Sequence, residues 1–381
     1  MDLSLTDEQT ALRDLARDVL TRGSTPERLA ALEAGDTWLD EPLWSQLADS
    51  GLLGAALPEE YGGGGATFLE VVQLLEQVGA TAAHVPVWAT LVLGALPLAR
   101  FGTPEQQARD LPDVAAGRAV LTAALVEPAG DPRRPASTAT RDGDGWVLEG
   151  QKTCVGVGPL ARRILVPTRV EGGSQGGDVA VFLLDPASPG VTLTPQVATH
   201  GEPQAHLALA GVRLSDADLL GGPEQGLAHG RDVLSWILDR ALTGLAAMQS
   251  GACATALAMA ASYTRTREQF ERPIATFQAV GHRLADSYVD VEAIRLTVLQ
   301  AAWRLVEGLP AADAVAVAKW WAAEGGHRVA HAASHVHGGM GVSLDYPLHR
   351  FTLLATYLEM ALGGAQHQQL IIGARLAAEP V

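Results

Sequence analysis

The chain has 381 residues and a mass of 39.8 kDa, more than one compact core usually holds, so we expect two or three layers or subdomains. Its 27 basic and 43 acidic side chains give a formal charge of −16, which repels phosphate backbones and anionic lipid and argues against nucleic-acid or membrane partners. Only two cysteines occur, Cys154 and Cys253, too few for a disulfide framework or a zinc site, so we predict no metal and a reducing cytoplasm.

The first third of the chain has apolar residues at helical spacing. Thr6 and Gln9 predict a capping box at the start of the first helix. Four glycines at 62–65 interrupt the pattern, and helices resume over 67–101. We therefore predict an all-helical N-terminal domain over residues 1–118.

The middle of the chain changes to β-forming residues from Val120 onward. Six short runs rich in β-branched and apolar residues follow, separated by Gly, Pro and Asp clusters. This pattern predicts a small β-barrel or sandwich in a middle domain over residues 119–226.

The helical period returns after residue 226 and holds to the end, with a bend at Pro273. The apolar stretch Ala241–Ala261 has charged residues just outside it, which favours a buried helix over a membrane span. We predict a C-terminal helical bundle over residues 227–381. Its long segments are expected near 227–265, 278–306, 311–337 and 346–376.

Six strings in this order carry a family resemblance. They are LPEEYGGGGAT (57–67), LVEPAG (125–130), LEGQKTCVGVG (148–158), VRLSDADLLGGPEQG (212–226), RTREQFERPIATFQAVGHRLADSYVDVEAIR (265–295) and HVHGGMGVSLDYPLHR (335–350). Together they resemble the acyl-CoA dehydrogenase family over nearly the whole chain. The resemblance implies an α+β fold with an N-terminal helical domain, a middle β-barrel, a C-terminal four-helix bundle, and FAD between barrel and bundle.

The resemblance also implies a reaction. In this family a carboxylate removes a proton from the carbon α to an acyl-CoA thioester, FAD accepts a hydride from the β carbon, and an electron-transfer flavoprotein is the expected electron acceptor. Removing so weak an acid needs a well-placed base and hydrogen bonds to the thioester oxygen.

Residues that relatives use at the diphosphate and adenine end of FAD are present. Arg267 is the residue that in relatives reaches the FAD pyrophosphate across a dimer interface, and a planar cation suits that double anion. Alone, Arg267 also fits a solvated helix arginine, and His335 also fits a surface or packing histidine. The remaining candidates from the matching strings are Gln269, Phe270, Phe277, Gln278, His335, Gly338, Gly339 and Gly341.

Contacts to the flavin ring are reduced. Val126 replaces the threonine of the family string TEPxAGSD. After GQK, relatives place an aromatic-Ile-Thr/Ser string beside flavin N5, where this chain has Cys-Val-Gly at 154–156. The side-chain hydroxyl that relatives place beside flavin N5 is therefore missing, and a backbone amide is the remaining group that can make this contact.

Neither usual position of the catalytic base carries a carboxylate. Leu362 occupies one position and Ala241 the other. Asp239 is a weak candidate, because two residues along a helix turn its side chain about 200° away from Ala241. Glu359, one turn before Leu362, is a second weak candidate, with a carboxylate satisfied by Arg350 or solvent as the alternative.

The chain keeps the residues for the diphosphate and adenine end of FAD but lacks the catalytic carboxylate. This combination predicts an assembly of two different subunits. Some bacterial acyl-CoA dehydrogenases that act on bulky CoA thioesters, notably of steroid side chains, resemble this pattern: two different family members form an α2β2 tetramer with about half the usual number of active sites. We predict a subunit of this kind. The alternatives are a stand-alone dehydrogenase or oxidase with a displaced base, and a purely structural partner subunit.

Overall fold

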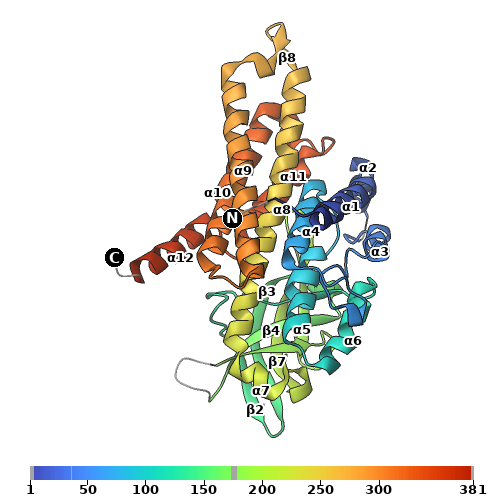
Figure 1. Ribbon diagram of the computed structural model, residues 1–381, viewed down its shortest axis with the longest axis vertical. Coiled ribbons are helices and arrows are strands. Elements are labelled where there is room, and N and C mark those ends of the chain that lie inside the picture. The colour runs from blue at the N-terminus through green and yellow to red at the C-terminus, as the bar shows by residue number, and fades with distance from the viewer. Residues whose placement is uncertain (1–3, 36, 173–177, 379–381) are drawn as a thin grey trace. The chain divides into compact units, whose positions relative to one another are not determined.

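The computed structural model describes residues 4–35, 37–172 and 178–378, and its contacts divide the chain into two compact units (Figure 1). The first unit holds Met1–Ala34, Thr67–His84 and Leu242–Val381, and the second holds Gly35–Ala66 and Val85–Ala241. Each unit is therefore built from separate stretches of sequence. The division into three consecutive domains stays a prediction.

A seven-stranded sheet forms the centre of the second unit. Its strands are β1 (Leu121–Ala123), β2 (Thr138–Asp142), β3 (Gly145–Gly156), β4 (Arg163–Val170), β5 (Val179–Leu184), β6 (Val191–Val197) and β7 (Pro203–Ser215). The order is β1-β4-β2-β3-β7-β6, with β5 paired to β4. The long strands β3 and β7 pair antiparallel with register shifts, whereas β1 and β2 each run parallel to β4.

The predicted β-rich middle region is present, with one strand more than the six runs read from the sequence. The additional strand is β2, which pairs with β3 as a hairpin. Ala139 is its one buried residue, and Arg141 and Asp142 are exposed. The strand therefore lacks the apolar content by which the other strands were recognised.

Helices flank this sheet in the second unit. They are α3 (Glu41–Asp49), η1 (Glu59–Tyr61), η2 (Trp88–Ala95), α5 (Leu96–Phe101), α6 (Pro104–Ala115), η3 (Gly158–Leu160), η4 (Asp216–Asp218), α7 (Gly222–Ala228) and the start of α8 (Gly230–Thr266). The indole nitrogen of Trp88 donates to the carbonyl oxygen of Ala241 at 3.2 Å. This hydrogen bond ties η2 to the first part of α8.

The first unit is helical apart from one short hairpin. Its elements are α1 (Asp7–Gly23), α2 (Pro26–Glu33), α4 (Phe68–Thr81), the rest of α8, β8 (Glu268–Gln269), β9 (Arg272–Pro273), η5 (Ile274–Thr276), α9 (Gln278–Val306), α10 (Ala312–His337), η6 (Gly338–Val342), α11 (Leu348–Met360) and α12 (Ala365–Ala378). The capping box of Thr6 and Gln9 is confirmed. Figure 1 shows the β8–β9 hairpin between the C-terminal end of α8 and the N-terminal end of α9.

The segment expected over 346–376 is not one helix. It breaks into α11 and α12, because Leu362 and Gly363 take φ values of 55° and 100°. These left-handed values are incompatible with a continuous α-helix. The break lies at the position where the family resemblance locates a base.

Close helix packing in the first unit depends on glycine. A side chain at Gly251 on α8 would collide with the carbonyl oxygen of Glu76 on α4. A side chain at Gly326 on α10 would likewise collide with Gln249. Within the described residues, one helix, Gly230–Thr266, is long and apolar enough to cross a membrane, and 61% of its apolar window is buried inside the fold. That burial is typical of a core helix.

Candidate functional site

Arg267 lies at the end of α8, where the chain turns into the β8–β9 hairpin. Its backbone N–H donates to the carbonyl oxygen of Tyr263 at 2.8 Å, and its carbonyl oxygen accepts from Ile274 N–H at 2.8 Å. Both bonds fix the main chain. The side chain is exposed, and its guanidinium forms no ion pair with any residue in the described part of the chain. It is therefore open to an external anion.

The hairpin beside Arg267 carries exposed aromatic surface. Phe270 is 86% exposed at a φ of 52°, and its ring meets the Phe277 ring edge-on at 6.1 Å. The guanidinium of Arg272 lies 4.3 Å above the Phe277 ring. Gln269 donates its side-chain amide to the carbonyl oxygen of Glu268 at 2.9 Å. Gln269 and Phe270 thus lie on one short hairpin, and Phe277, just before α9, packs against it.

The segment around His337 lies beside the same end of α8. The His337 ring stacks on Tyr263 at 4.3 Å, and its Nε2 lies 3.2 Å from the Tyr346 hydroxyl. Burial lowers the pKa of His337, although its hydrogen bond with the Ala333 carbonyl oxygen opposes this shift. His337 is therefore a packing residue, and it holds the following glycines next to the turn of α8 that leads to Arg267.

The three expected glycines differ in their surroundings. Gly338 and Gly339 are exposed, and a side chain at either position would meet no atom within 4 Å. Their backbone is accessible to a ligand. Gly341 is buried, and its absent side chain would lie 2.6 Å from the carbonyl oxygen of Ser334. Gly341 therefore serves the packing of η6 on α10.

His335 and Gln278 face other side chains of the bundle surface. His335 is exposed and contacts the guanidinium of Arg283 through Nδ1. Gln278, the first residue of α9, places its amide nitrogen 3.4 Å from His282 Nε2. Arg283 was not among the sequence candidates, and its only signal was its place inside the string FQAVGHRLAD.

In the second unit, the expected ring contacts lie at the end of β3. Cys154 is exposed at a φ of 51°, and its N–H donates to Gln196 Oε1 at 3.2 Å. The neighbouring Thr153 N–H donates to the carbonyl oxygen of Val126 at 2.9 Å. Two backbone amides that could replace the missing hydroxyl are therefore already bonded within the chain.

Glu202 fills the place next to Gly156. Glu202 Oε1 lies 2.9 Å from the position that a side chain at Gly156 would take. The Gln204 amide donates to the same oxygen at 3.4 Å, and His200 Nε2 lies 3.9 Å from Oε2. Glu202 is only 9% exposed. A carboxylate oxygen thus lies beside the residue at which the family resemblance expects a hydroxyl.

Glu127, in the string LVEPAG, has a structural role. The fully buried Lys152 donates to Glu127 Oε1 at 2.7 Å and to the Pro167 carbonyl oxygen at 2.7 Å. The backbone N–H groups of Ala136 and Ser137 donate to the two Glu127 oxygens. All of these contacts are internal, so Glu127 holds the strands together.

Glu359 is paired, but with a different residue from the one considered in the sequence. His327 Nδ1 lies 3.0 Å from Glu359 Oε2. Arg350 instead makes a bidentate ion pair with Glu33, at 2.6 and 2.8 Å. The expectation that Arg350 could satisfy Glu359 is therefore wrong, because α2 supplies the carboxylate that Arg350 uses.

Asp239 lies at the start of α8 in the second unit. Its Oδ1 is 3.9 Å from Arg133 Nη2, and its side chain is 18% exposed. Ala241, two residues on, is fully buried. Arg240 stacks over Trp236 at 3.7 Å, and burial lowers the pKa of Arg240 to about 10, with Asp239 opposing the shift. Asp239 therefore belongs to a cluster of charged groups.

A fully buried lysine lies next to the break between α11 and α12. Lys319 on α10 donates to the carbonyl oxygens of Leu358 and Glu359 at 2.7 and 2.9 Å. Burial lowers the pKa of Lys319 to about 7, although the Glu359 carboxylate opposes the shift. Lys319 was not among the predicted site residues. A lone Lys inside the apolar face AVAVAKWWAA was its only signal.

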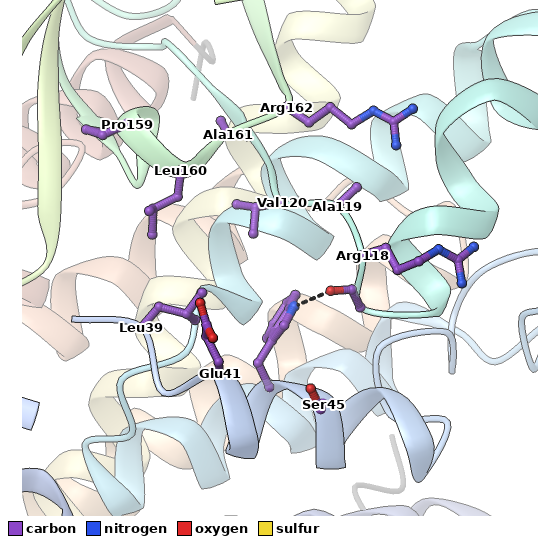
Figure 2. Close-up of a pocket in the computed structure, with 12 residues that line it drawn as sticks. Leu39, Glu41, Ser45, Arg118, Ala119, Val120, Pro159, Leu160, Ala161 and Arg162 are labelled. Atoms are coloured by element: carbon purple, nitrogen blue, oxygen red, sulfur yellow. Dashed lines mark hydrogen bonds between the residues drawn. The ribbon is translucent and has the colours of Figure 1, made fainter. Parts of the chain in front are cut away.

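Figure 2 shows a pocket of about 400 Å³ in the second unit. Leu39 and Glu41 from the start of α3 lie on one side and Leu160 on another, while Arg118 and Arg162 point away. Both arginines bind Asp113. None of the residues expected at a cofactor or base position lines this pocket.

The residues present fit one end of FAD and not the other. The open Arg267 guanidinium and the accessible backbone at Gly338 and Gly339 suit a diphosphate. At the end of β3, the Cys154 amide is already bonded and Glu202 fills the space beside Gly156. The second unit therefore does not offer the expected ring contacts.

Comparison with known proteins covers almost the whole chain. Three family models match: acyl-CoA dehydrogenase, N-terminal domain (6–118), middle domain (123–214) and C-terminal domain (228–377). The chain is 41% identical over 389 residues to acyl-CoA dehydrogenase FadE27 of Mycobacterium tuberculosis, covering 100% of both. The α+β fold expected from the sequence is confirmed.

Two solved structures are similar over nearly their full length. One is the ChsE4-ChsE5 complex from Mycobacterium tuberculosis, with a TM-score of 0.92, 42% identity and 100% of both chains covered. The other is a variant of the Tcur3481-Tcur3483 steroid ACAD, with a TM-score of 0.89, 42% identity, and 98% of this chain and 99% of that chain covered. Both similar chains come from proteins that are named as pairs.

Proposed function

Because the chain belongs to the acyl-CoA dehydrogenase family, we propose that it is one subunit of an FAD-dependent acyl-CoA dehydrogenase that works with a homologous partner subunit. The complex catalyses α,β-dehydrogenation of an acyl-CoA thioester. The partner supplies the carboxylate that removes the α proton. This chain contributes to the diphosphate and adenine end of the cofactor site.

This proposal rests on the residues found at the two usual positions of the catalytic base. Leu362 and Ala241 cannot accept a proton, and Ala241 is fully buried. The nearest carboxylates are engaged, Glu359 with His327 and Asp239 in the cluster with Arg133 and Arg240. A base in a second chain supplies the missing group without any rearrangement of these contacts.

The chain's own residues bind and position. Arg267 neutralises the pyrophosphate of FAD as a planar double donor. The backbone at Gly338 and Gly339 allows close approach, and the ring contact between Phe270 on the β8–β9 hairpin and Phe277 at the start of α9 provides an apolar surface. When bound, FAD supplies the acceptor for the hydride that leaves the β carbon of the substrate.

A second family member is the proposed partner, in an α2β2 assembly. Support comes from the ChsE4-ChsE5 complex and the Tcur3481-Tcur3483 steroid ACAD, which match this chain at 42% identity. The latter name also supports a CoA thioester of a steroid side chain as substrate. An electron-transfer flavoprotein is the proposed acceptor. The two free cysteines, Cys154 and Cys253, support a reducing cytoplasmic location.

Expression with and without a homologous partner tests the proposal. FAD content is measured by flavin absorbance after gel filtration, and turnover is measured with steroid side-chain and straight-chain CoA thioesters. We expect the lone chain to be flavin-poor and inactive, and the pair to hold FAD and turn over. Stoichiometric FAD with activity in the lone chain would overturn the proposal in favour of a stand-alone enzyme. An unchanged flavin content of the partner with or without this chain would indicate a purely structural subunit.

A further inference from the structure

We propose that His327 and His331 on α10 form a surface site for a divalent transition-metal ion of the Zn²⁺ class, and that Glu359 on α11 orients His327 for it. The inference goes beyond the proposed function and does not depend on it. The sequence-based prediction of no metal rested on the two cysteines, whereas this site needs only imidazole nitrogens. Within residues 4–35, 37–172 and 178–378, no three His, Cys, Asp or Glu side chains are already grouped around a metal position. The protein therefore supplies two ligands, and water completes the coordination.

The two histidines lie on one exposed face of α10. They are four residues apart, so their side chains are neighbours on successive turns of the helix. Their ring centres are 4.3 Å apart with the planes tilted by 35°, and both side chains are exposed. Imidazole nitrogens bind zinc at about 2.0–2.1 Å, so rings at this spacing can each direct one nitrogen to a shared ion. Two histidines at this spacing on one helix face are typical of helical zinc sites.

Glu359 fixes the state of the His327 ring. His327 Nδ1 lies 3.0 Å from Glu359 Oε2. An ionised carboxylate only accepts hydrogen bonds, so Nδ1 carries the ring proton and the lone pair of the neutral ring is on Nε2. A carboxylate behind a metal-binding histidine is the usual second layer of such sites. The Glu359 backbone is itself held by Lys319, which donates to its carbonyl oxygen at 2.9 Å. His327 is therefore oriented for a metal ion before the ion binds.

The next histidine on this face is not suited to the same role. His335 lies four residues after His331, but its Nδ1 contacts the guanidinium of Arg283. A guanidinium only donates, so Nδ1 accepts and Nε2 carries the ring proton. The charge of Arg283 also repels a cation there. Beside His327, in contrast, the charge of Arg328 is offset by ion pairs with two carboxylates. The contacts thus select His327 and His331 as the metal-binding pair.

A bound ion would connect α10 to α11. Its positive charge polarises the His327 ring and strengthens the hydrogen bond from Nδ1 to the Glu359 carboxylate. Glu359 lies near the end of α11, shortly before the left-handed break at Leu362. Metal binding should therefore stabilise this end of α11 and raise the Tm of the protein.

The test is a Zn²⁺ titration of the purified, untagged complex with its partner, after treatment with EDTA and dialysis. Affinity is measured by competition with a chromogenic zinc chelator. We expect His327→Ala and His331→Ala each to weaken binding by at least about tenfold, and Glu359→Gln to weaken it by about tenfold through loss of the orienting carboxylate. The wild-type Tm should rise by about 3 °C at a free Zn²⁺ concentration a hundred times the dissociation constant.

His229→Ala is the matched control. His229 Nδ1 also lies near a carboxylate, 3.7 Å from Asp232 Oδ2, but Val233 stands four residues after it, so there is no second imidazole at that spacing. We expect this variant to bind Zn²⁺ as the wild type does. Wild-type affinity in His327→Ala or His331→Ala, or a tenfold loss in His229→Ala, would overturn the proposed site. Wild-type affinity in Glu359→Gln would overturn the orienting role. FAD content and turnover do not enter these measurements, so failure here leaves the proposed function intact.

Discussion

Replacing Lys319 by Met should change how stability depends on pH. Lys319 is fully buried on α10, and its amine donates to the last carbonyl oxygens of α11, those of Leu358 and Glu359. Methionine has a similar length and no charge. The variant therefore loses two hydrogen bonds, at about 1–3 kcal/mol for each carbonyl left unpaired, and also loses a group whose protonation differs between folded and unfolded chains.

The pH-dependent part of the difference in stability follows from the lowered pKa of Lys319. Lys319 has a pKa of about 7 in the fold and 10.5 as the reference value. Between these values the unfolded chain binds more protons, so the wild-type free energy of unfolding rises with pH. At 1.36 kcal/mol per pKa unit, the penalty on the folded state is about 4 kcal/mol at pH 7 and about 2 kcal/mol at pH 9. The Met variant has no such penalty.

The assay is thermal unfolding of the wild-type and Lys319→Met complexes at pH 7 and pH 9. All other titrating groups are shared, so their contributions cancel in the difference. With about 2.1 cal/mol/K per residue, 381 residues give about 0.8 kcal/mol per degree. The Tm of the wild type minus the Tm of the variant should therefore increase by about 2–3 °C from pH 7 to pH 9, whichever protein is the more stable at pH 7. A signed difference that is constant, or that decreases, would refute the reasoning.

Three further predictions concern charged side chains. Arg267→Ala should weaken FAD retention in the complex by about 1.5–3 kcal/mol, measured by flavin loss on dialysis, and an unchanged flavin content would make Arg267 a surface arginine. Asp239→Asn and Glu359→Gln should each leave turnover within a few-fold of wild type; a loss of about a hundredfold with FAD still bound would assign the base to this chain. Glu33→Ala should cost about 1–2 kcal/mol at pH 7, because Arg350 is only 8% exposed and would lose its bidentate partner, although Glu33 itself is 35% exposed and partly solvated.

The Glu33 pair should also depend on pH. Burial is the largest single effect and opposes ionisation of Glu33, but the hydrogen bonds and charge of Arg350, together with the charges of His84 and His349, outweigh it and lower the pKa of Glu33 below 4.5. The stabilisation is therefore complete above that value and is lost as pH falls toward the folded pKa. The difference in Tm between wild type and Glu33→Ala should shrink in acid, and a difference that persists unchanged at pH 3 would contradict this assignment.

Local patterns in the sequence predicted most elements of the fold. The Thr6 and Gln9 capping box and the long apolar periods of α8, α9 and α10 are local signals, and all are present. Strand β2 was missed because only Ala139 faces the core. The α11–α12 break was missed because the left-handed backbone begins at Leu362, a residue type that rarely adopts it.

The contacts of the candidate site were harder to predict than its residues. Arg350 and Glu33 are 317 residues apart in sequence, so no local pattern links them. Glu202, the residue before β7, lies beside Gly156 at the end of β3, and Gln196 meets Cys154 across 42 residues. The sequence could show that a hydroxyl was missing at residue 156. Only the three-dimensional structure shows that the Glu202 side chain lies beside it.

The burial of both lysines has a chemical consequence. Lys152 and Lys319 are the only lysines in the sequence, and each is 0% exposed, whereas the other 25 basic side chains are all arginines. The folded chain therefore presents no ε-amine to solvent. Thioesters of CoA acylate unprotonated amines directly, and guanidinium groups do not share this reactivity because they stay charged. The lysines of a protein that works among activated acyl groups are thus protected against acylation by its own substrate class, and amine-directed cross-linkers should leave both lysines unlabelled until the fold opens.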